Sequence, residues 1–178
     1  MSLPPRRALL PSWQRAPGSL SRRIAALGTR FEVQTLHQGP ARLRPRERAD
    51  IGGGRAWVRE VLLKLDGAPL VWARSVTPCR ALRGPWRALR GLGTRPLADL
   101  LFADPRVRRL PLRRERLPHG GPLRRRLARE WAQATGTAPP RGLVHARSSV
   151  FHRHGAPLRV MEAFAPALAQ VTPPRRRT

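Results

Sequence analysis

Several residue types are scarce in this sequence of 178 residues, and each shortage excludes a class of structure or function. Tyrosine is absent, and cysteine occurs once, as Cys79. A single cysteine can form neither an internal disulfide nor the paired-cysteine motif of a zinc site, so we expect an inert thiol and no metal. No apolar run is long enough to span a bilayer, and the N-terminus lacks the apolar stretch of a signal peptide. We therefore expect a cytoplasmic protein without a membrane span.

Acidic residues are scarce as well. There are 10 of them against 36 basic residues, which gives a formal net charge of +26. Every basic residue except Lys64 is arginine, and the arginines are spread along the chain between leucines and prolines. This spread favours a solvated surface over a nucleic-acid interface, which would gather its cations and usually add aromatic platforms for bases. A nucleic-acid-binding protein is kept only as an alternative.

The length and a hydrophobic content of 40% are those of one domain with a genuine core. We expect this domain to span residues 9–171, between Pro- and Arg-rich tails at 1–8 and 172–178. The local pattern predicts a short helix before Pro17, a helix at 19–27, a strand at 30–37, a loop at 41–54, a helix from Leu97, and a helix at 123–135 inside an Arg-rich insertion at about 110–141.

The residues Gly-Ala-Pro-Leu occur twice, at 67–70 and 155–158, each time between two apolar runs. Asp-Gly precedes the first copy, as a two-residue type I′ turn prefers, and His-Gly occupies the same place in the second. This layout predicts β-hairpins at 56–78 and 143–166. Together with the helices it predicts an α+β domain, in which an antiparallel sheet of hairpins carries helices on one side.

The first hairpin contains two arginines that need an anionic partner. A two-residue turn places Arg59 opposite Arg74 on an otherwise apolar face. Like charges that face each other destabilise a sheet, and a buried ion without a partner costs several kcal/mol. We therefore expect an anion beside them. It is either an internal carboxylate or a bound one, which arginine can hold with two parallel hydrogen bonds.

The second hairpin places Arg147 opposite Glu162 by the same geometry. Two interpretations of Glu162 stay open at this point. The carboxylate is either a structural ion pair with Arg147, or an acid or base that points into a pocket also lined by arginines.

A larger pattern is formed by four stretches, in chain order: LGTRFEV at 27–33, WVREVLLKLDGAPLVWARSVTP at 57–78, LRGPWRALRGLGTRPLADLLF at 82–102 and RSSVFHRHGAPLRVMEAFAPAL at 147–168. Taken together, they resemble the bacterial chorismate pyruvate-lyase family, which makes 4-hydroxybenzoate for ubiquinone biosynthesis. The resemblance implies a single-domain fold whose site is buried beneath two helical flaps and needs neither a metal nor an organic cofactor.

The same resemblance implies roles for five residues. Arg59 would bind the ring carboxylate of chorismate or of the product, helped by the backbone N–H groups of Leu27 and Leu97. Glu162 would contact the 4-hydroxyl group, and Arg74 would bind the second carboxylate. The chain departs from the family pattern at 27–28, where Leu-Gly replaces the usual Met-Thr, and in the Arg-rich segment at 110–141.

We therefore expect a carbon-oxygen lyase that acts as a monomer on chorismate. Glu162 could act as a base, or the C4 hydrogen could pass within the substrate to the enolpyruvyl group. The alternative function is a non-catalytic binder of small aromatic acids, because the same fold serves as the effector-binding module of some transcription regulators. Such regulators carry a DNA-binding segment first, and we expect the stretch before Leu27 to be too short for one.

Overall fold

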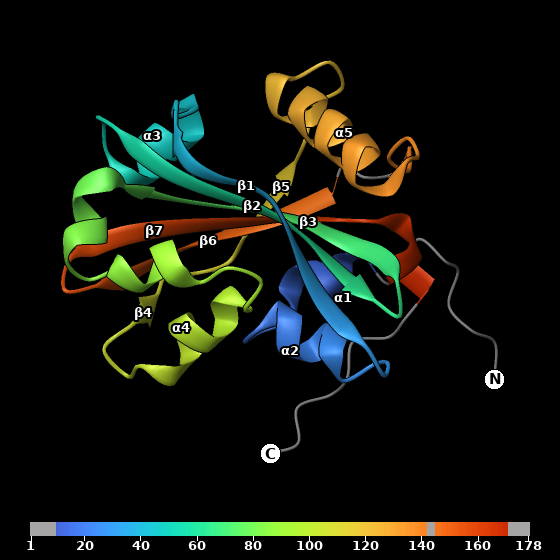
Figure 1. The fold of residues 1–178 in the computed structure, drawn as a ribbon, viewed down its shortest axis with the longest axis horizontal. Helices are drawn as coiled ribbons and strands as arrows, with labels where there is room; N and C mark the ends of the chain where they lie inside the picture. The colour runs from blue at the N-terminus through green and yellow to red at the C-terminus, as the bar shows by residue number, and fades with distance from the viewer. Residues whose placement is uncertain (1–9, 142–144, 171–178) are drawn as a thin grey trace.

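Within residues 10–141 and 145–170, which the computed structural model describes, seven strands form one antiparallel sheet (Figure 1). The strands lie in the order β1-β2-β3-β7-β6, and β4 and β5 both pair with the free edge of β6. Their bounds are β1 Phe31–Ala41, β2 Ala56–Leu65, β3 Ala68–Pro78, β4 Arg108–Arg109, β5 Arg113–Arg116, β6 His145–Arg153 and β7 Ala156–Phe164. The tails predicted at 1–8 and 172–178 lie outside the described residues.

Helices cover both faces of this sheet. Below it in Figure 1 lie α1 (Leu10–Arg15), α2 (Leu20–Ala25) and α4 (Leu97–Ala103), and above it lie α3 (Pro45–Ile51) and α5 (Pro122–Thr135). Short 3-10 helices occupy Cys79–Arg83, Arg87–Gly91 and Pro166–Gln170. The predicted single-domain α+β architecture is confirmed. The expectation of helices on one side only is wrong, because both faces of the central strands are apolar and need cover.

The helix predictions succeeded where capping and proline signals are plain. Ser19 caps α2 by accepting a hydrogen bond from the backbone N–H of Arg22 (3.1 Å), and α4 begins at Leu97 as predicted. The predicted loop at 41–54 is wrong, since it contains α3. Pro45 occupies the first turn of α3, and the Glu47 carboxylate accepts from the backbone N–H of Arg44 (3.0 Å), which is half of a capping box.

The segment at 110–141 is an integral part of the sheet and its cover. It supplies β5, which pairs with β6, and α5, whose extent closely matches the predicted helix at 123–135. On α5, Leu127 and Trp131 pack with Leu62 of β2 and Trp72 of β3 in one buried cluster.

Both hairpins have the predicted two-residue turns. Leu65 pairs with Ala68 across the first turn, where Asp66 and Gly67 have φ values of 50° and 80°. His154 and Gly155 have φ values of 48° and 75° in the second turn. Positive φ at both central residues is the signature of a type I′ turn, which explains the Asp-Gly and His-Gly pairs.

The register of the first hairpin differs from the prediction because of a β-bulge on β3. Lys64 pairs with Pro69, but Leu63 pairs with Val71, so Leu70 is an extra residue that faces no partner on β2. The bulge lets both Leu70 and Val71 pack into the core. Beyond it every pair is shifted by one residue. Arg59 consequently lies opposite Ser75, and the prediction that it faces Arg74 is wrong.

The shifted register divides the side chains of β2 and β3 between two faces. The flap face, covered by α1, α2 and α4, carries Arg59, Val61, Leu63, Ala73 and Ser75. The opposite side, here called the network face, carries Glu60, Leu62, Trp72 and Arg74. The second hairpin has no bulge, and Arg147 pairs with Glu162 as predicted.

Candidate functional site

A cavity, here called the flap cavity, lies between the flap face and the helices α2 and α4. Its polar lining consists of Ser19, Ser21, Arg59, Ser75, Arg109, Arg147, Ser149 and Glu162, and its apolar lining includes Val61, Leu63, Leu97, Leu101, Phe151 and Val160. Its volume is about 50 Å³, so the cavity is narrow. The helices α2 and α4, here called the two flaps, border it.

Arg59 is the most buried cation without a counter-ion in this cavity. Only 3% of it is exposed, and Nη2 donates to the backbone carbonyls of Gly93 (2.8 Å) and Arg95 (3.1 Å). Its Nε is buried and has no hydrogen-bond partner, and no carboxylate of the described residues forms an ion pair with it. Burial lowers the pKa of Arg59 to about 10. The guanidinium is therefore held charged and ready for an external anion.

Arg109 is a second such cation, and the sequence analysis missed it. It comes from β4, where Nε donates to Ser149 Oγ (3.2 Å) and Nη1 to the carbonyl of Gly18 (3.0 Å). Its guanidinium carbon lies 5.2 Å from the ring centroid of Phe151. Burial, followed by the charge of Arg147, lowers its pKa. Among so many arginines, nothing in the sequence distinguishes this one, because only the pairing of β4 with β6 brings it to the cavity.

Glu162 and Arg147 form the predicted structural ion pair of the second hairpin, and a role of Glu162 as an acid or base stays a prediction. Arg147 Nε donates to Glu162 Oε2 at 2.5 Å, which is the structural ion pair. Arg147 Nη1 also donates to the backbone carbonyls of Trp13 (3.2 Å) and Ala16 (2.7 Å), so α1 fixes its position. Glu162 nonetheless lines the flap cavity. The carboxylate is therefore oriented by Arg147 and available to a ligand.

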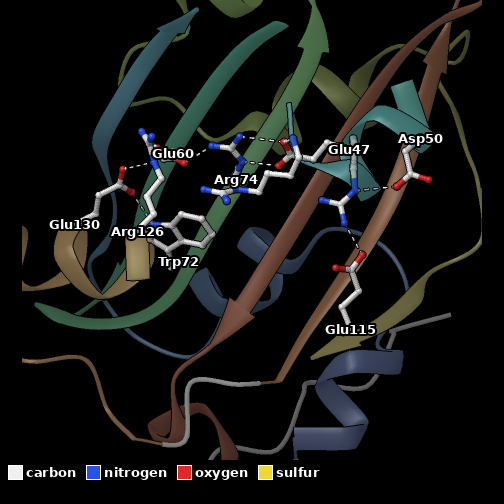
Figure 2. Close-up of polar contacts among 10 residues, drawn as sticks. Glu47, Asp50, Glu60, Trp72, Arg74, Glu115, Arg126 and Glu130 are labelled. Carbon is white, nitrogen blue, oxygen red and sulfur yellow. Dashed lines mark hydrogen bonds and ion pairs between the residues drawn. The ribbon is translucent and has the colours of Figure 1, made fainter. Parts of the chain in front are cut away.

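Arg74 does not reach this cavity, which contradicts its predicted role as a ligand for a substrate carboxylate. It lies on the network face, only 1% exposed (Figure 2). Its Nε and Nη2 donate to Glu47 (2.6 and 3.1 Å), and its Nη1 donates to Glu60. Internal carboxylates therefore neutralise Arg74. This was one of the two predicted alternatives, the other being a bound carboxylate. The physical reason for the error is the bulge at Leu70, which moves Arg74 to the other side of the sheet.

The network around Arg74 continues to α5. Arg126 donates to Glu60 (2.8 Å) and to Glu130 (2.8 Å), and Glu130 also accepts from Trp72 Nε1 (3.0 Å) (Figure 2). Burial and the adjacent Glu60 carboxylate raise the pKa of Glu130 to about 7. The two carboxyl groups therefore share a proton near neutral pH, which joins α5 to the sheet without an additional cation.

The two flap residues predicted from the resemblance, Leu27 and Leu97, differ in whether their backbone N–H is free to bind a ligand. Leu97 is the first residue of α4 and lines the flap cavity, and its N–H has no carbonyl acceptor within the helix. Leu27 follows α2 and packs against the core, but its N–H donates to the carbonyl of Ile24 (3.0 Å). Leu27 can therefore contact a ligand only after the end of α2 rearranges.

The turn of the first hairpin anchors the end of the α2 flap. Asp66 Oδ1 accepts from the backbone N–H groups of Thr29 (3.2 Å) and Arg30 (2.8 Å) and from Thr29 Oγ1 (2.8 Å). These bonds lower the pKa of Asp66. Gly28 lies so close to the turn that a Cβ atom there would clash with Asp66 and Leu65. The departure to glycine at position 28 therefore permits a tight closure of this flap.

The described part of the chain offers no group of three or more His, Cys, Asp or Glu side chains that could hold a metal ion. None of its helices combines the length and the apolar composition that a bilayer crossing requires.

Comparison with known proteins gives a consistent result. A family model described as chorismate lyase matches residues 2–169. The chain is 49% identical over 156 residues to a probable chorismate pyruvate-lyase of Albidiferax ferrireducens, covering 86% of this chain and 79% of that protein. It is 44% identical over 174 residues to a protein of the same description from an Azoarcus strain, covering 94% and 90%.

Among solved structures, the fold resembles PhnF from Mycobacterium smegmatis. The TM-score is 0.59 at 14% identity, over 92% of this chain and 70% of that one. The separate effector domain of the same protein gives a TM-score of 0.55, over 83% of this chain and 88% of that one. At this identity the likeness concerns the fold alone.

Proposed function

The chain belongs to the chorismate lyase family, and on that premise we propose that it is a carbon-oxygen lyase that converts chorismate to 4-hydroxybenzoate and pyruvate. The observation that carries the proposal is the charge of the flap cavity. Arg59 is buried there and Arg109 is half-buried, and neither forms an ion pair with a carboxylate of the described chain. Chorismate is a dianion, and its two carboxylates would supply the missing counter-ions.

We assign the ring carboxylate of chorismate to Arg59 and the enolpyruvyl carboxylate to Arg109, which takes the place predicted for Arg74. The N–H of Leu97 can support the ring carboxylate, and that of Leu27 can do so after the flap rearranges. Glu162, held by Arg147, is suited to accept a hydrogen bond from the 4-hydroxyl group at the opposite end of the ring.

The chemistry needs orientation more than activation, because loss of the enolpyruvyl group leaves an aromatic ring. The C3–O bond breaks and the C4 hydrogen leaves. In one route Glu162 takes that hydrogen as a proton, and the departing enolpyruvate is protonated to pyruvate. In the other route, the hydrogen passes directly to the enolpyruvyl methylene in a cyclic step. Burial lowers the pKa of both arginines, and a carboxylate contact is stronger in such a low-dielectric site than in water.

The test mixes the purified protein with chorismate and follows the absorbance of 4-hydroxybenzoate, with pyruvate measured in a coupled assay. The two products should appear in equal amounts. Binding of chorismate without turnover would instead favour the binder of small aromatic acids. A steep salt-dependent affinity for RNA, without turnover, would favour nucleic-acid binding.

The variant Glu162→Gln separates the two routes. Glutamine keeps the size and an acceptor oxygen but cannot take a proton. Retained turnover with altered substrate affinity would contradict the general-base route, and loss of turnover with intact product binding would contradict the intramolecular one. The matched control is Arg129→Gln, an exposed residue of α5, which should leave both quantities unchanged.

We further propose, from the family resemblance, that the product enters ubiquinone biosynthesis and that the enzyme works in the cytoplasm. We also propose that the enzyme is a monomer. The domain is proposed to extend over residues 9–171.

A further inference from the structure

A second cavity, here called the α5 cavity, lies on the network face, so the sheet separates it from the flap cavity. It is bounded by the start of α3, by β5 with the residues that follow it, and by the first turn of α5. Its volume is about 390 Å³, and its walls include Arg44, Arg116, Arg124, Arg159, Leu117 and Leu123. Nothing in the proposed lyase reaction uses it.

The carboxylates in its wall already have partners. Glu115 Oε1 accepts from Arg159 Nη2 (2.5 Å), and both oxygens of Glu47 accept from Arg74 (Figure 2). Three arginines of the wall remain, namely Arg44, Arg116 and Arg124. None of the three forms an ion pair within the described part of the chain. The α5 cavity therefore has a surplus of positive charge that the fold does not compensate.

Two guanidinium nitrogens at this cavity also lack an acceptor. Arg44 Nε and Arg124 Nη1 are buried from solvent, and neither finds a hydrogen-bond partner. A buried donor without a partner costs free energy, and more so when it is charged. Burial, followed by the charge of Arg74, lowers the pKa of Arg44. An anion in the cavity would relieve both the unpaired donors and the repulsion.

The first turn of α5 adds to the same preference. This helix has 14 residues, begins after Gly121 without a side-chain cap, and has no acidic residue in its first turn. The free N–H groups of such a turn carry the positive end of the helix dipole. This turn borders the same cavity as the unpaired arginines, because Gly121, Leu123 and Arg124 all line it.

We propose that the α5 cavity is a binding site for a small organic oxyanion, in which a carboxylate or phosphate group is joined to an apolar body. Arg44, Arg116 and Arg124 bind the oxyanion, and Leu117 and Leu123 contact the apolar body. The site is independent of the lyase reaction, and a ligand can occupy it while the flap cavity holds substrate or product.

The experiment measures binding by calorimetry with three probes, namely phenyl phosphate, benzoate and inorganic phosphate, each with 4-hydroxybenzoate present to occupy the flap cavity. One saturable site per chain is expected for phenyl phosphate or benzoate, and their ranking tells a phosphate ligand from a carboxylate ligand. Inorganic phosphate should bind more weakly, because it lacks the apolar body.

The double variant Arg44→Gln and Arg124→Gln should weaken binding by about tenfold or more, since charge-assisted hydrogen bonds are lost. The control Arg129→Gln removes one exposed charge of the same helix and should have no effect. Equal weakening in the control would reduce the site to diffuse charge attraction and overturn the proposal. Absence of saturation would overturn it as well.

A measurement on the unmodified protein covers the case in which the double variant does not fold. The amide resonances of Gly121 and Leu123 should shift as phenyl phosphate is added, while those of Leu97 and Ser149 in the flap cavity stay unchanged. Shifts confined to the flap cavity would place the probe in the wrong site and refute the assignment.

Discussion

Replacing Arg59 by methionine should abolish turnover and at the same time make the protein more stable. In the folded protein, burial lowers the pKa of Arg59 from its ordinary value to about 10. This shift corresponds to about 3 kcal/mol by which folding disfavours the charged guanidinium. Two hydrogen bonds to the carbonyls of Gly93 and Arg95 would be lost, at about 1 kcal/mol each. The expected net gain in the free energy of unfolding is about 1–2 kcal/mol.

The pH dependence has a definite sign. Below pH 10 the guanidinium is charged in both the folded and the unfolded state, so the whole penalty applies at neutral pH. It decreases only as the pH rises from about 10 towards the ordinary pKa of arginine, where the unfolded state still binds the proton and the folded state does not. The stability gain of the Arg59→Met variant should therefore be fully visible at pH 7.

Arg74→Met on the adjacent strand is the matched control, with the opposite expected result. Its removal leaves Glu47 unpaired and deprives Glu60 of one of its two cations. Breaking a buried ion pair on one side typically costs about 3–5 kcal/mol. The two variants make the same chemical change on opposite faces of one hairpin.

The assay is urea unfolding followed by tryptophan fluorescence, with the midpoint compared at an unchanged slope, together with the turnover of chorismate. A midpoint of Arg59→Met below that of the unmodified protein would show that an internal anion had already compensated this arginine. Retained turnover would show that the ring carboxylate binds elsewhere. Either result would refute the assignment of Arg59.

Three other variants test the remaining assignments. Arg109→Gln should raise the KM for chorismate by about tenfold or more. It should leave inhibition by 4-hydroxybenzoate unchanged, since the product lacks the enolpyruvyl carboxylate. Equal effects on the KM and on the inhibition constant would contradict the role of Arg109. Asp66→Ala should free the end of the α2 flap, which weakens product inhibition and raises kcat, and an unchanged inhibition constant would exclude the anchor. Glu130→Gln should abolish the loss of stability that the unmodified protein shows as the pH rises from 4.5 to 7, because the raised pKa of Glu130 makes the folded state bind more protons in that range and glutamine does not titrate. An identical pH profile in urea unfolding would contradict this.

The sequence predicted the turns of both hairpins because a type I′ turn depends on two adjacent residues. It also predicted the Arg147–Glu162 pair, since the second hairpin runs without interruption. It failed for Arg74 because the bulge at Leu70 follows from packing: the second copy of Gly-Ala-Pro-Leu has the same letters and no bulge. Local sequence therefore could not decide the register.

Two features, Arg109 in the site and the helix α3, were not predicted from the sequence, for two different reasons. Arg109 reaches the flap cavity only through a two-residue strand whose pairing with β6 is set by contacts distant in sequence. The helix α3 did have a local signal, because Pro45 and the capping Glu47 mark a helix start. The three glycines at 52–54 that follow it are typical of a loop, and they favoured a loop prediction for the whole segment.

The bulge at Leu70 gives β3 one residue more than its pairing with β2 requires. Deletion of Leu70 would close the bulge and leave every later pair of the hairpin in register, so that Arg74 would still face Glu60 and Arg59 would still face Ser75. A hairpin that kept all its residues but lost the bulge would instead bring Arg74 to the flap face. The extra residue therefore acts as a spacer: this part of β3 can lose one residue without moving a charged side chain to the other face of the sheet.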